Sequence, residues 1–221
     1  CAMPALHLIT ANRNYSSWSL RPWLLLRKLG VEFEDTRVLL QTDDFKQQIA
    51  HYSPAGKVPV LLDGELAIWD SLAIMEYLAE AYPQVWPEFK ASRALARSVS
   101  AEMHSGFMAL RSKMPMNCRA EGRSVAHDEA LDKDIERIQA IWTECRLRYG
   151  QSGPWLFGQF SIADAMFAPV VFRFNTYGVK CQGLAGDYLQ TVLQDEDMLC
   201  WQHAAQQEQE VLMGYETGLT A

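Results

Sequence analysis

Three serines precede a leucine-rich segment near the start of the chain, in NRNYSSWSLRPWLLLRKLG, residues 12–30. A hydroxyl at the beginning of a helix can satisfy a backbone N–H group that has no partner within the helix. It can also hold an anion, because the first turn carries partial positive charge. Pro22 fits best in a first turn, which makes Ser19 the predicted N-cap. Ser16 and Ser17 then precede the helix and are free to bind an anion, although serines in turns commonly bond only local backbone.

Charge and composition narrow the class of protein. The 221 residues carry a net charge of -7, and 49% of them are hydrophobic, which suits one large or two small globular domains. The acidic balance disfavours a broad basic surface for nucleic acid or anionic lipid. No apolar run reaches the roughly 18 to 20 residues that span a bilayer, and the chain opens without a signal segment. We therefore expect a cytoplasmic protein.

The cysteines predict neither a disulfide framework nor a metal site. Five are present, an odd number without a C-x-x-C pair, at positions 1, 118, 145, 181 and 200. Zinc sites and disulfide scaffolds need paired spacings, so we expect reduced thiols and no metal. Cys1 and Ala2 precede Met3, which we expect to be the natural start.

The elements around the serines alternate between strand and helix patterns over the first 83 residues. The patterns predict strands at 5–10 and 31–40, a helix at 19–29, a short helix or turn at 43–51, two strands around Asp63-Gly64, and a helix from Ser71 to Tyr82. A strand–helix–strand unit followed by a hairpin and a helix predicts one mixed sheet with helices on both faces. This is the thioredoxin-like arrangement.

Beyond residue 83 the strand patterns vanish, which predicts an all-helical domain. We expect a thioredoxin-like domain at 3–83, a linker at 84–92 and a helical domain at 93–221. The predicted helices are one near 88–114, one at 127–149 with an apolar stripe (Leu131, Ile135, Ile138, Trp142, Cys145 and Tyr149), and one capped by Ser161 with Asp164 three residues on.

One dense motif carries a family resemblance. The segment SPAGKVPVLLDGELAIWDSLAIMEYLAE, residues 53–80, combines a Val-Pro pair, an acid–serine pair and an S-x-A-I-x-x-Y-L helix. It resembles the glutathione-binding half of the cytosolic glutathione S-transferases, in bacterial-type, theta- or zeta-like members that use serine; in the family this proline is cis. The resemblance implies an α/β plus all-α fold, with a thioredoxin-like N-terminal domain followed by an all-helical C-terminal domain.

The resemblance also implies glutathione as co-substrate, and each group of this tripeptide has a candidate partner. Val58, before Pro59, would offer its backbone to the cysteinyl part as a strand does. Ser71 at a helix start suits the γ-glutamyl carboxylate, and Asp70 suits the ammonium group. Lys57 either reaches the glycyl carboxylate or is simply solvated.

For the thiol, Ser17 or Ser16 would donate a hydrogen bond to sulfur near the first helix, and both effects favour the thiolate. Alignment of Arg21 and Gly30 with theta- and zeta-like members places Ser17 on the theta-type serine and Ser16-Ser17 on the zeta-type pair. Zeta-like members follow that pair with Cys, whereas this chain has Trp18, which speaks against zeta-type isomerase chemistry.

The second substrate is harder to place. His104, Phe107 and Arg111 share one face of a helix over 88–114 and would face its pocket, although packing or dimer contacts fit equally well. The main interpretation is a glutathione transferase that activates the thiolate for attack on a small electrophile, in detoxification.

Other function classes remain open. The alternatives are a zeta-like glutathione-dependent isomerase, or a non-catalytic glutathione-binding or scaffold protein. A thiol-disulfide oxidoreductase is disfavoured, because serine stands where a nucleophilic Cys is needed. The resemblance further implies a homodimer, for which we expect the 69–77 region to pack against Met103, Phe107 and Met108 of the second subunit.

Overall fold

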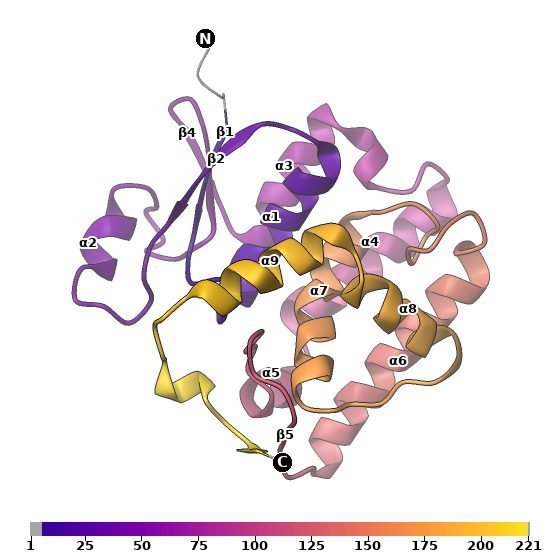
Figure 1. Ribbon diagram of the computed structural model, residues 1–221. Helices are drawn as coiled ribbons and strands as arrows, with labels where there is room; N and C mark the ends of the chain where they lie inside the picture. Colours follow the sequence, from indigo (N-terminus) through magenta and orange to yellow (C-terminus); the bar gives the residue numbers. More distant parts are fainter. Residues whose placement is uncertain (1–5, 221) are drawn as a thin grey trace.

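The computed structural model describes residues 6–220. Its N-terminal part contains a mixed four-stranded sheet (Figure 1). Cys1, Ala2 and Met3, and with them the expectation about the natural start, lie outside the described residues, as does the first residue of the strand expected at 5–10. The strands are β1 (Leu6–Thr10), β2 (Phe33–Arg37), β3 (Val60–Asp63) and β4 (Leu66–Trp69), in the order β2-β1-β3-β4. β1 pairs parallel with β2 and antiparallel with β3, and β3 pairs antiparallel with β4. The expected mixed sheet is confirmed.

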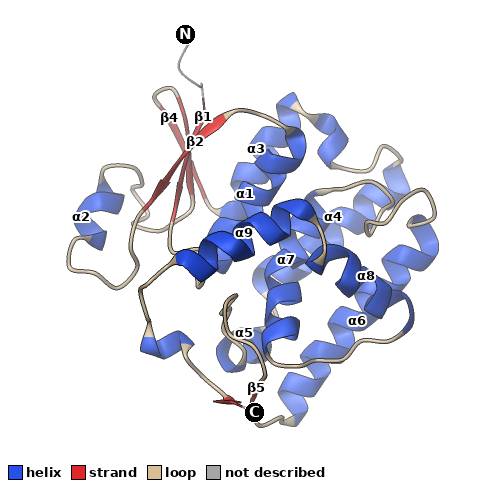
Figure 2. Ribbon diagram, viewed as in Figure 1, coloured by secondary structure: helices blue, strands red, loops and turns tan. Residues whose placement is uncertain are grey.

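Helices cover both faces of this sheet (Figure 2). They are α1 (Ser17–Leu29) and α3 (Ser71–Ala81) on one face and α2 (Phe45–Ala50) on the other. Successive side chains of a strand point to opposite faces. Leu8 and Leu61 accordingly pack with α1 and α3 in the main core, whereas Ile9 and Val60 pack with α2 in a second, smaller core.

The start of α1 differs from the expectation. The helix begins at Ser17 with Ser16 as N-cap, so the prediction that Ser19 caps a helix limited by Pro22 is wrong, and Pro22 lies inside α1. A proline there removes one backbone hydrogen bond. Burial of α1 between the sheet and the helical domain offsets that cost, since every side chain from Ser19 to Leu26 is buried.

The hairpin and the helix after it agree with the prediction. β3 and β4 join at Gly64, whose φ of 62° suits a tight turn. Asp70 is the N-cap of α3, and its side chain accepts a hydrogen bond from the backbone N–H of Ala73 at 3.0 Å. Val58-Pro59 is a cis peptide bond, as the family resemblance implied.

The helical half surrounds one buried helix, α7 (Figure 1). Its elements are α4 (Lys90–Ser105), α5 (Met108–Lys113), α6 (Glu129–Tyr149), α7 (Ile162–Thr176), α8 (Gly183–Leu193) and α9 (Glu196–Gln207), with the 3-10 turns η1 (Pro83–Val85) and η2 (Met213–Tyr215) and the short pair β5 (Arg123–Ser124) and β6 (Leu219–Thr220). The expected start of α7 is confirmed, because Ser161 is its N-cap and donates its backbone N–H to Asp164 at 2.9 Å.

The single helix expected over 88–114 is wrong. Gly106 and Phe107 break it into α4 and α5, and Phe107 adopts a left-handed φ of 61°. This break turns the Phe107 side chain into the core, where it is 8% exposed. The apolar stripe of α6 is confirmed as core, since Leu131 through Cys145 along that stripe are buried. Within residues 6–220, no helix combines the length and the hydropathy needed to cross a bilayer.

Candidate functional site

Two adjoining cavities lie where the sheet domain meets the helical domain. The serine cavity, of about 410 Å³, includes Ser16, Ser17 and Arg111 in its lining. The aspartate cavity, of about 460 Å³, is lined by Asp70, Ser71, Pro59 and His104 among others. Trp18, Lys57 and Val58 line both cavities, so the two form one continuous site.

Ser16 and Ser17 differ in what their hydroxyls contact. Ser16 Oγ donates to Ser19 Oγ at 2.7 Å, and Ser19 Oγ accepts the backbone N–H of Ala11 at 3.2 Å. Ser16, the N-cap, is therefore bonded to the first turn of α1. The Ser17 hydroxyl has no hydrogen-bond partner among residues 6–220, and Ser17 is the first residue of α1. It is the free donor at the positive end of this helix.

The aspartate cavity combines both domains. Asp70 has a φ of 75°, and its Oδ1 lies 3.1 Å from Nε2 of His104, which α4 supplies. Ser71 is buried, and its Oγ has no partner among the described residues. A buried hydroxyl without a partner costs stability, so Ser71 is suited to bind a polar ligand group.

Val58 supplies the backbone edge between the cavities. It precedes the cis proline and stands just before β3, and neither its N–H nor its carbonyl has a partner elsewhere in the described chain. Both groups are thus available to an extended peptide. Lys57 beside it contributes a cation to both cavities.

Trp18 is a site residue that the sequence interpretation did not select. Two guanidinium groups lie over its ring, with Arg21 Cζ at 4.5 Å and Arg111 Cζ at 4.7 Å from the ring centroid. The ring of His104 meets it edge-on at 5.4 Å. Arg21 is buried and donates Nε to the carbonyl of Met166 at 2.9 Å; burial, and then the charge of Arg111, lowers the pKa of Arg21 well below its usual value.

Phe107, which we expected at the second-substrate pocket, lines neither cavity and packs in the main core. Phe107 itself has the left-handed φ that breaks the helix, so its side chain does not share a helix face with His104 and Arg111.

The sequence interpretation also missed Arg173 and Tyr215, which line the serine cavity. An arginine inside the apolar helix α7 was a usable signal, whereas the sequence around Tyr215 gave none.

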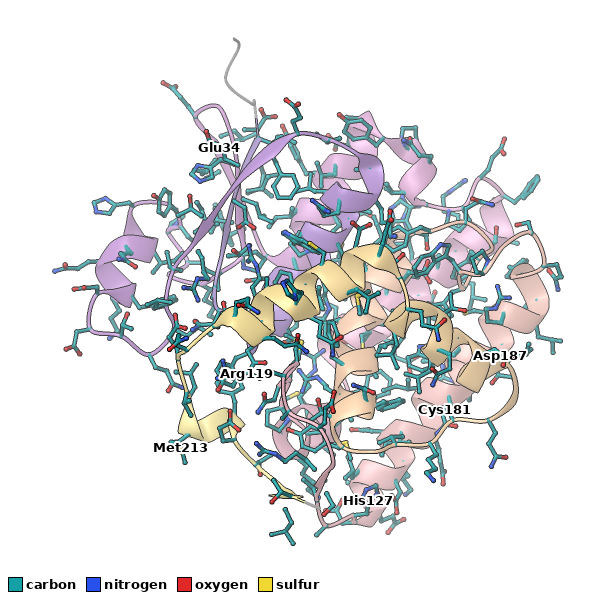
Figure 3. The ribbon with its side chains drawn as sticks, viewed as in Figure 1. Glu34, Arg119, His127, Cys181, Asp187 and Met213 are labelled. Atoms are coloured by element: carbon teal, nitrogen blue, oxygen red, sulfur yellow. The ribbon has the colours of Figure 1, made fainter. Side chains whose placement is uncertain are left out.

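The C-terminal segment closes the serine cavity. Tyr215 packs against Tyr15 with ring centroids 5.1 Å apart, and the Tyr15 hydroxyl donates to Glu216 at 2.7 Å. Arg119 holds the same segment through the carbonyl of Glu208 at 2.6 Å and through the Tyr15 hydroxyl at 3.0 Å. Figure 3 shows Arg119 beside this yellow segment.

Metal ligands do not gather in the described part of the chain: residues 6–220 hold no group of three His, Cys, Asp or Glu side chains arranged to bind an ion. The four cysteines in this range are free thiols, and none stands at the start of α1.

Two protein-family models match the chain. The model for the glutathione S-transferase N-terminal domain matches residues 15–81, and the model for the C-terminal domain matches residues 128–188. The chain belongs to the glutathione S-transferase family. The matched ranges contain the serines, the cis proline and the Asp70-Ser71 pair on one side, and α7 on the other.

Individual glutathione S-transferase relatives are distant. A probable maleylacetoacetate isomerase of Caenorhabditis elegans is 30% identical over 172 residues, covering 76% of this chain and 78% of that protein. A stringent starvation protein A homolog of Histophilus somni is 23% identical over 182 residues, covering 80% and 81%. The crystal structure of a glutathione transferase homolog from Burkholderia GL BGR1 with bound glutathione has a TM-score of 0.69 at 23% identity, covering 92% of this chain and 99% of that one.

Proposed function

We propose that the protein is a glutathione transferase in which Ser17 activates the glutathione thiolate for attack on a small electrophile. The observation that carries this proposal is the free Ser17 hydroxyl, which stands at the first residue of α1 and lines a cavity continuous with Asp70 and Ser71. A donor at a helix N-terminus favours the charged form of a bound thiol.

Glutathione would extend across both cavities. Its γ-glutamyl end would lie in the aspartate cavity, with the carboxylate on the Ser71 hydroxyl and the ammonium on Asp70. Its cysteinyl part would pair with the backbone of Val58, and Lys57 would hold the glycyl carboxylate. This pose places the sulfur in the serine cavity, beside Ser17.

The chemistry then needs no base on the protein. Lowering a thiol pKa from about 8.5 by roughly two units requires about 2.7 kcal/mol. A hydrogen bond to a charged group together with a helix N-terminus can supply that amount. The thiolate attacks the electrophilic atom and forms the carbon–sulfur bond, and the leaving group departs with its electron pair.

His104 belongs with glutathione rather than with the second substrate in this proposal. It contacts Asp70 and lines only the aspartate cavity, whereas Arg111 lines the serine cavity beside Ser17. The second substrate would therefore meet Arg111. Phe107 has no part in this binding.

Two other readings have a specific observation behind them. The C. elegans relative is named as a probable maleylacetoacetate isomerase, which favours zeta-like isomerase chemistry, but Trp18 replaces the Cys of zeta-like members. The relative from Histophilus somni is named as a stringent starvation protein A homolog and not as a transferase, so a binding role without catalysis is the second alternative.

A two-step experiment separates these readings. Retention on glutathione-agarose with elution by free glutathione is expected of the transferase and of a binder, but not of a scaffold protein that has lost the ligand. The eluted protein is then assayed with chlorodinitrobenzene as electrophile and with a cis-dienone diacid as isomerase substrate. Retention without turnover of either compound would contradict the proposal.

We further propose a cytoplasmic homodimer in detoxification, with domains at 3–83 and 93–221. The expected interface needs correction in part: Met103 and Phe107 are buried within the chain and cannot form a dimer face, whereas Met108 and Trp69 are exposed. A larger cavity of about 900 Å³ between α3 and α4, lined by Tyr77, Trp86 and Arg97 among others, is the better candidate.

A further inference from the structure

The charged groups around the serine cavity all have the same sign. Lys57, Arg111 and Arg173 contribute to its lining, and no Asp or Glu does. The protein as a whole has a net charge of -7, so this local excess of cations opposes the overall balance. Such an arrangement attracts anions into the cavity.

Arg173 comes from α7 and is only 6% exposed. Its Nη1 donates to the carbonyl of Met114 at 2.7 Å and to that of Arg111 at 3.4 Å. These bonds fix the guanidinium and leave its other nitrogens without a partner in the described chain. Burial, and then the charge of Arg111, lowers the pKa of Arg173 to about 10, which keeps it cationic at neutral pH.

Arg111 is fixed as firmly as Arg173. Its Nε donates to the carbonyl of Gly106 at 2.8 Å, and its Nη2 donates to the carbonyls of Met103 and His104 at the end of α4. The Trp18 ring, whose centroid is 4.7 Å from Arg111 Cζ, adds a cation–π contact. Within residues 6–220, no carboxylate pairs with either Arg111 or Arg173.

A buried cation without a counter-charge is costly, and proteins normally pair it or neutralise it. Arg21 is also buried without a carboxylate partner, and its Nη1 has no hydrogen-bond partner among the described residues, but Arg21 lines neither cavity and cannot offer its charge to a ligand there. Arg111 and Arg173 instead face the space beside Ser17. Their missing partner is therefore expected in a ligand.

We propose that the serine cavity takes electrophiles that carry a carboxylate, held by Arg111 and Arg173 while the electrophilic carbon meets the thiolate at Ser17. This proposal rests on the proposed transferase function. Planar guanidinium groups suit a carboxylate because they offer paired donors. The carboxylates of glutathione have other candidate partners, Ser71 and Lys57, on the sheet domain.

A matched pair of probes tests the charge. In para-chloro-meta-nitrobenzoate, the thiolate forms a bond to the ring carbon that bears chlorine, the carbon–chlorine bond breaks, and chloride leaves with the electron pair. The carboxylate is unchanged. The corresponding benzamide reacts identically but is neutral. The kcat/KM of each probe is divided by its uncatalysed rate constant with glutathione, and the ratio of the two quotients is the carboxylate preference.

We expect a carboxylate preference of about tenfold or more in the wild-type protein, as a charge-assisted pair provides. Arg173→Gln should reduce that preference to near one. Arg148→Gln, which removes an exposed guanidinium of α6 outside both cavities, is the matched control and should keep it. A wild-type preference of one or less would overturn the proposal.

A binding measurement keeps the test independent of folding of the variant and of turnover. Calorimetry of the wild-type protein, saturated with glutathione, should show meta-nitrobenzoate binding about tenfold tighter than meta-nitrobenzamide. Equal affinities would overturn the anion site. If neither probe is turned over but the benzoate still binds more tightly, the transferase proposal fails and the anion site stands. If Arg173→Gln weakens glutathione itself tenfold, the arginines hold the tripeptide and not the electrophile.

Discussion

His104 Nε2 on α4 lies 3.1 Å from Oδ1 of Asp70, the N-cap of α3. This contact crosses from the helical domain to the sheet domain at the end of the site where glutathione would place its ammonium group. The same carboxylate caps α3 through Ala73. Asp70 thus joins two domains and a helix start, and its charge is available to a ligand.

Asp70→Asn should weaken glutathione binding by about 10- to 100-fold, the range for losing a charged hydrogen bond. Asn retains an acceptor for the helix cap and tolerates the positive φ of this residue. Turnover at saturating glutathione should change little, because the ammonium is remote from the reacting sulfur. Calorimetry measures the affinity.

Asp128→Asn is the matched control, since Asp128 is the N-cap of α6 and accepts from Leu131 at 2.9 Å outside both cavities. It should leave the affinity unchanged. Equal affinities for the Asp70→Asn and wild-type proteins would reduce Asp70 to a helix cap.

Ser17→Ala should raise the pKa of the bound thiol by about one to two units, since a hydrogen bond to a charged group contributes about 1.5–3 kcal/mol. Turnover at neutral pH should fall with the thiolate fraction, while glutathione still binds. Titration of thiolate absorbance against pH, with glutathione bound, measures the midpoint.

Ser16→Ala is the comparison for Ser17→Ala. Ser16 bonds Ser19, so its loss should affect the first turn of α1 more than the thiol. A midpoint that moves in Ser16→Ala and stays fixed in Ser17→Ala would transfer the role to Ser16.

Asp164 should give stability a pH dependence. Burial raises the pKa of Asp164 to about 6, even though the backbone of Leu156 and Ser161 and the hydroxyl of Tyr188 donate to it. The folded state then holds this proton more tightly than the unfolded state, whose pKa is about 3.9. The contribution to the free energy of unfolding is therefore greatest below about pH 4 and falls as pH rises to about 6, by at most about 1.4 kcal/mol per pH unit.

Urea unfolding between pH 4 and 7 measures that slope, and Asp164→Asn should remove it. Asp187→Asn, an exposed carboxylate on α8, should leave the slope as it is. A slope of the opposite sign that disappears only in Asp164→Asn would show that the hydrogen bonds outweigh burial.

Assembly is tested on the face between α3 and α4. At micromolar concentration, sedimentation should give twice the subunit mass, and Arg97→Glu, beside Trp86 on that face, should shift the protein toward the single subunit. Arg137→Glu on α6, away from that cavity, is the control. A wild-type protein of one subunit mass that binds glutathione at full stoichiometry would show that the dimer is dispensable.

Local signals accounted for much of the fold. The Asp63-Gly64 turn, the Ser161–Asp164 helix start and the α6 stripe act over a few residues, so the sequence pattern alone predicts them. The start of α1 and the break at Phe107 could not be predicted in this way. Tertiary packing sets both, since α1 is buried around Pro22 and the Phe107 side chain turns into the core.

The residues of the candidate site also differ in whether a local sequence pattern predicts them. Ser17, Val58, Asp70 and Ser71 belong to short motifs, and they line the joined cavities. Arg173 reaches the serine cavity only because α7 crosses behind it, and no local pattern encodes that crossing. A lone arginine in an apolar helix is nevertheless a feature that sequence analysis can flag for a buried charged site.

The hydrogen bond from the Tyr15 hydroxyl to Glu216 joins residues 201 positions apart in the sequence. During synthesis the sheet domain and α1 leave the ribosome long before the segment that holds Tyr215 and Glu216. The wall of the serine cavity is thus among the last parts of the molecule that can form. A nascent chain could acquire its glutathione-facing half early, while the compartment for the electrophile stays open to water until translation has passed Glu216.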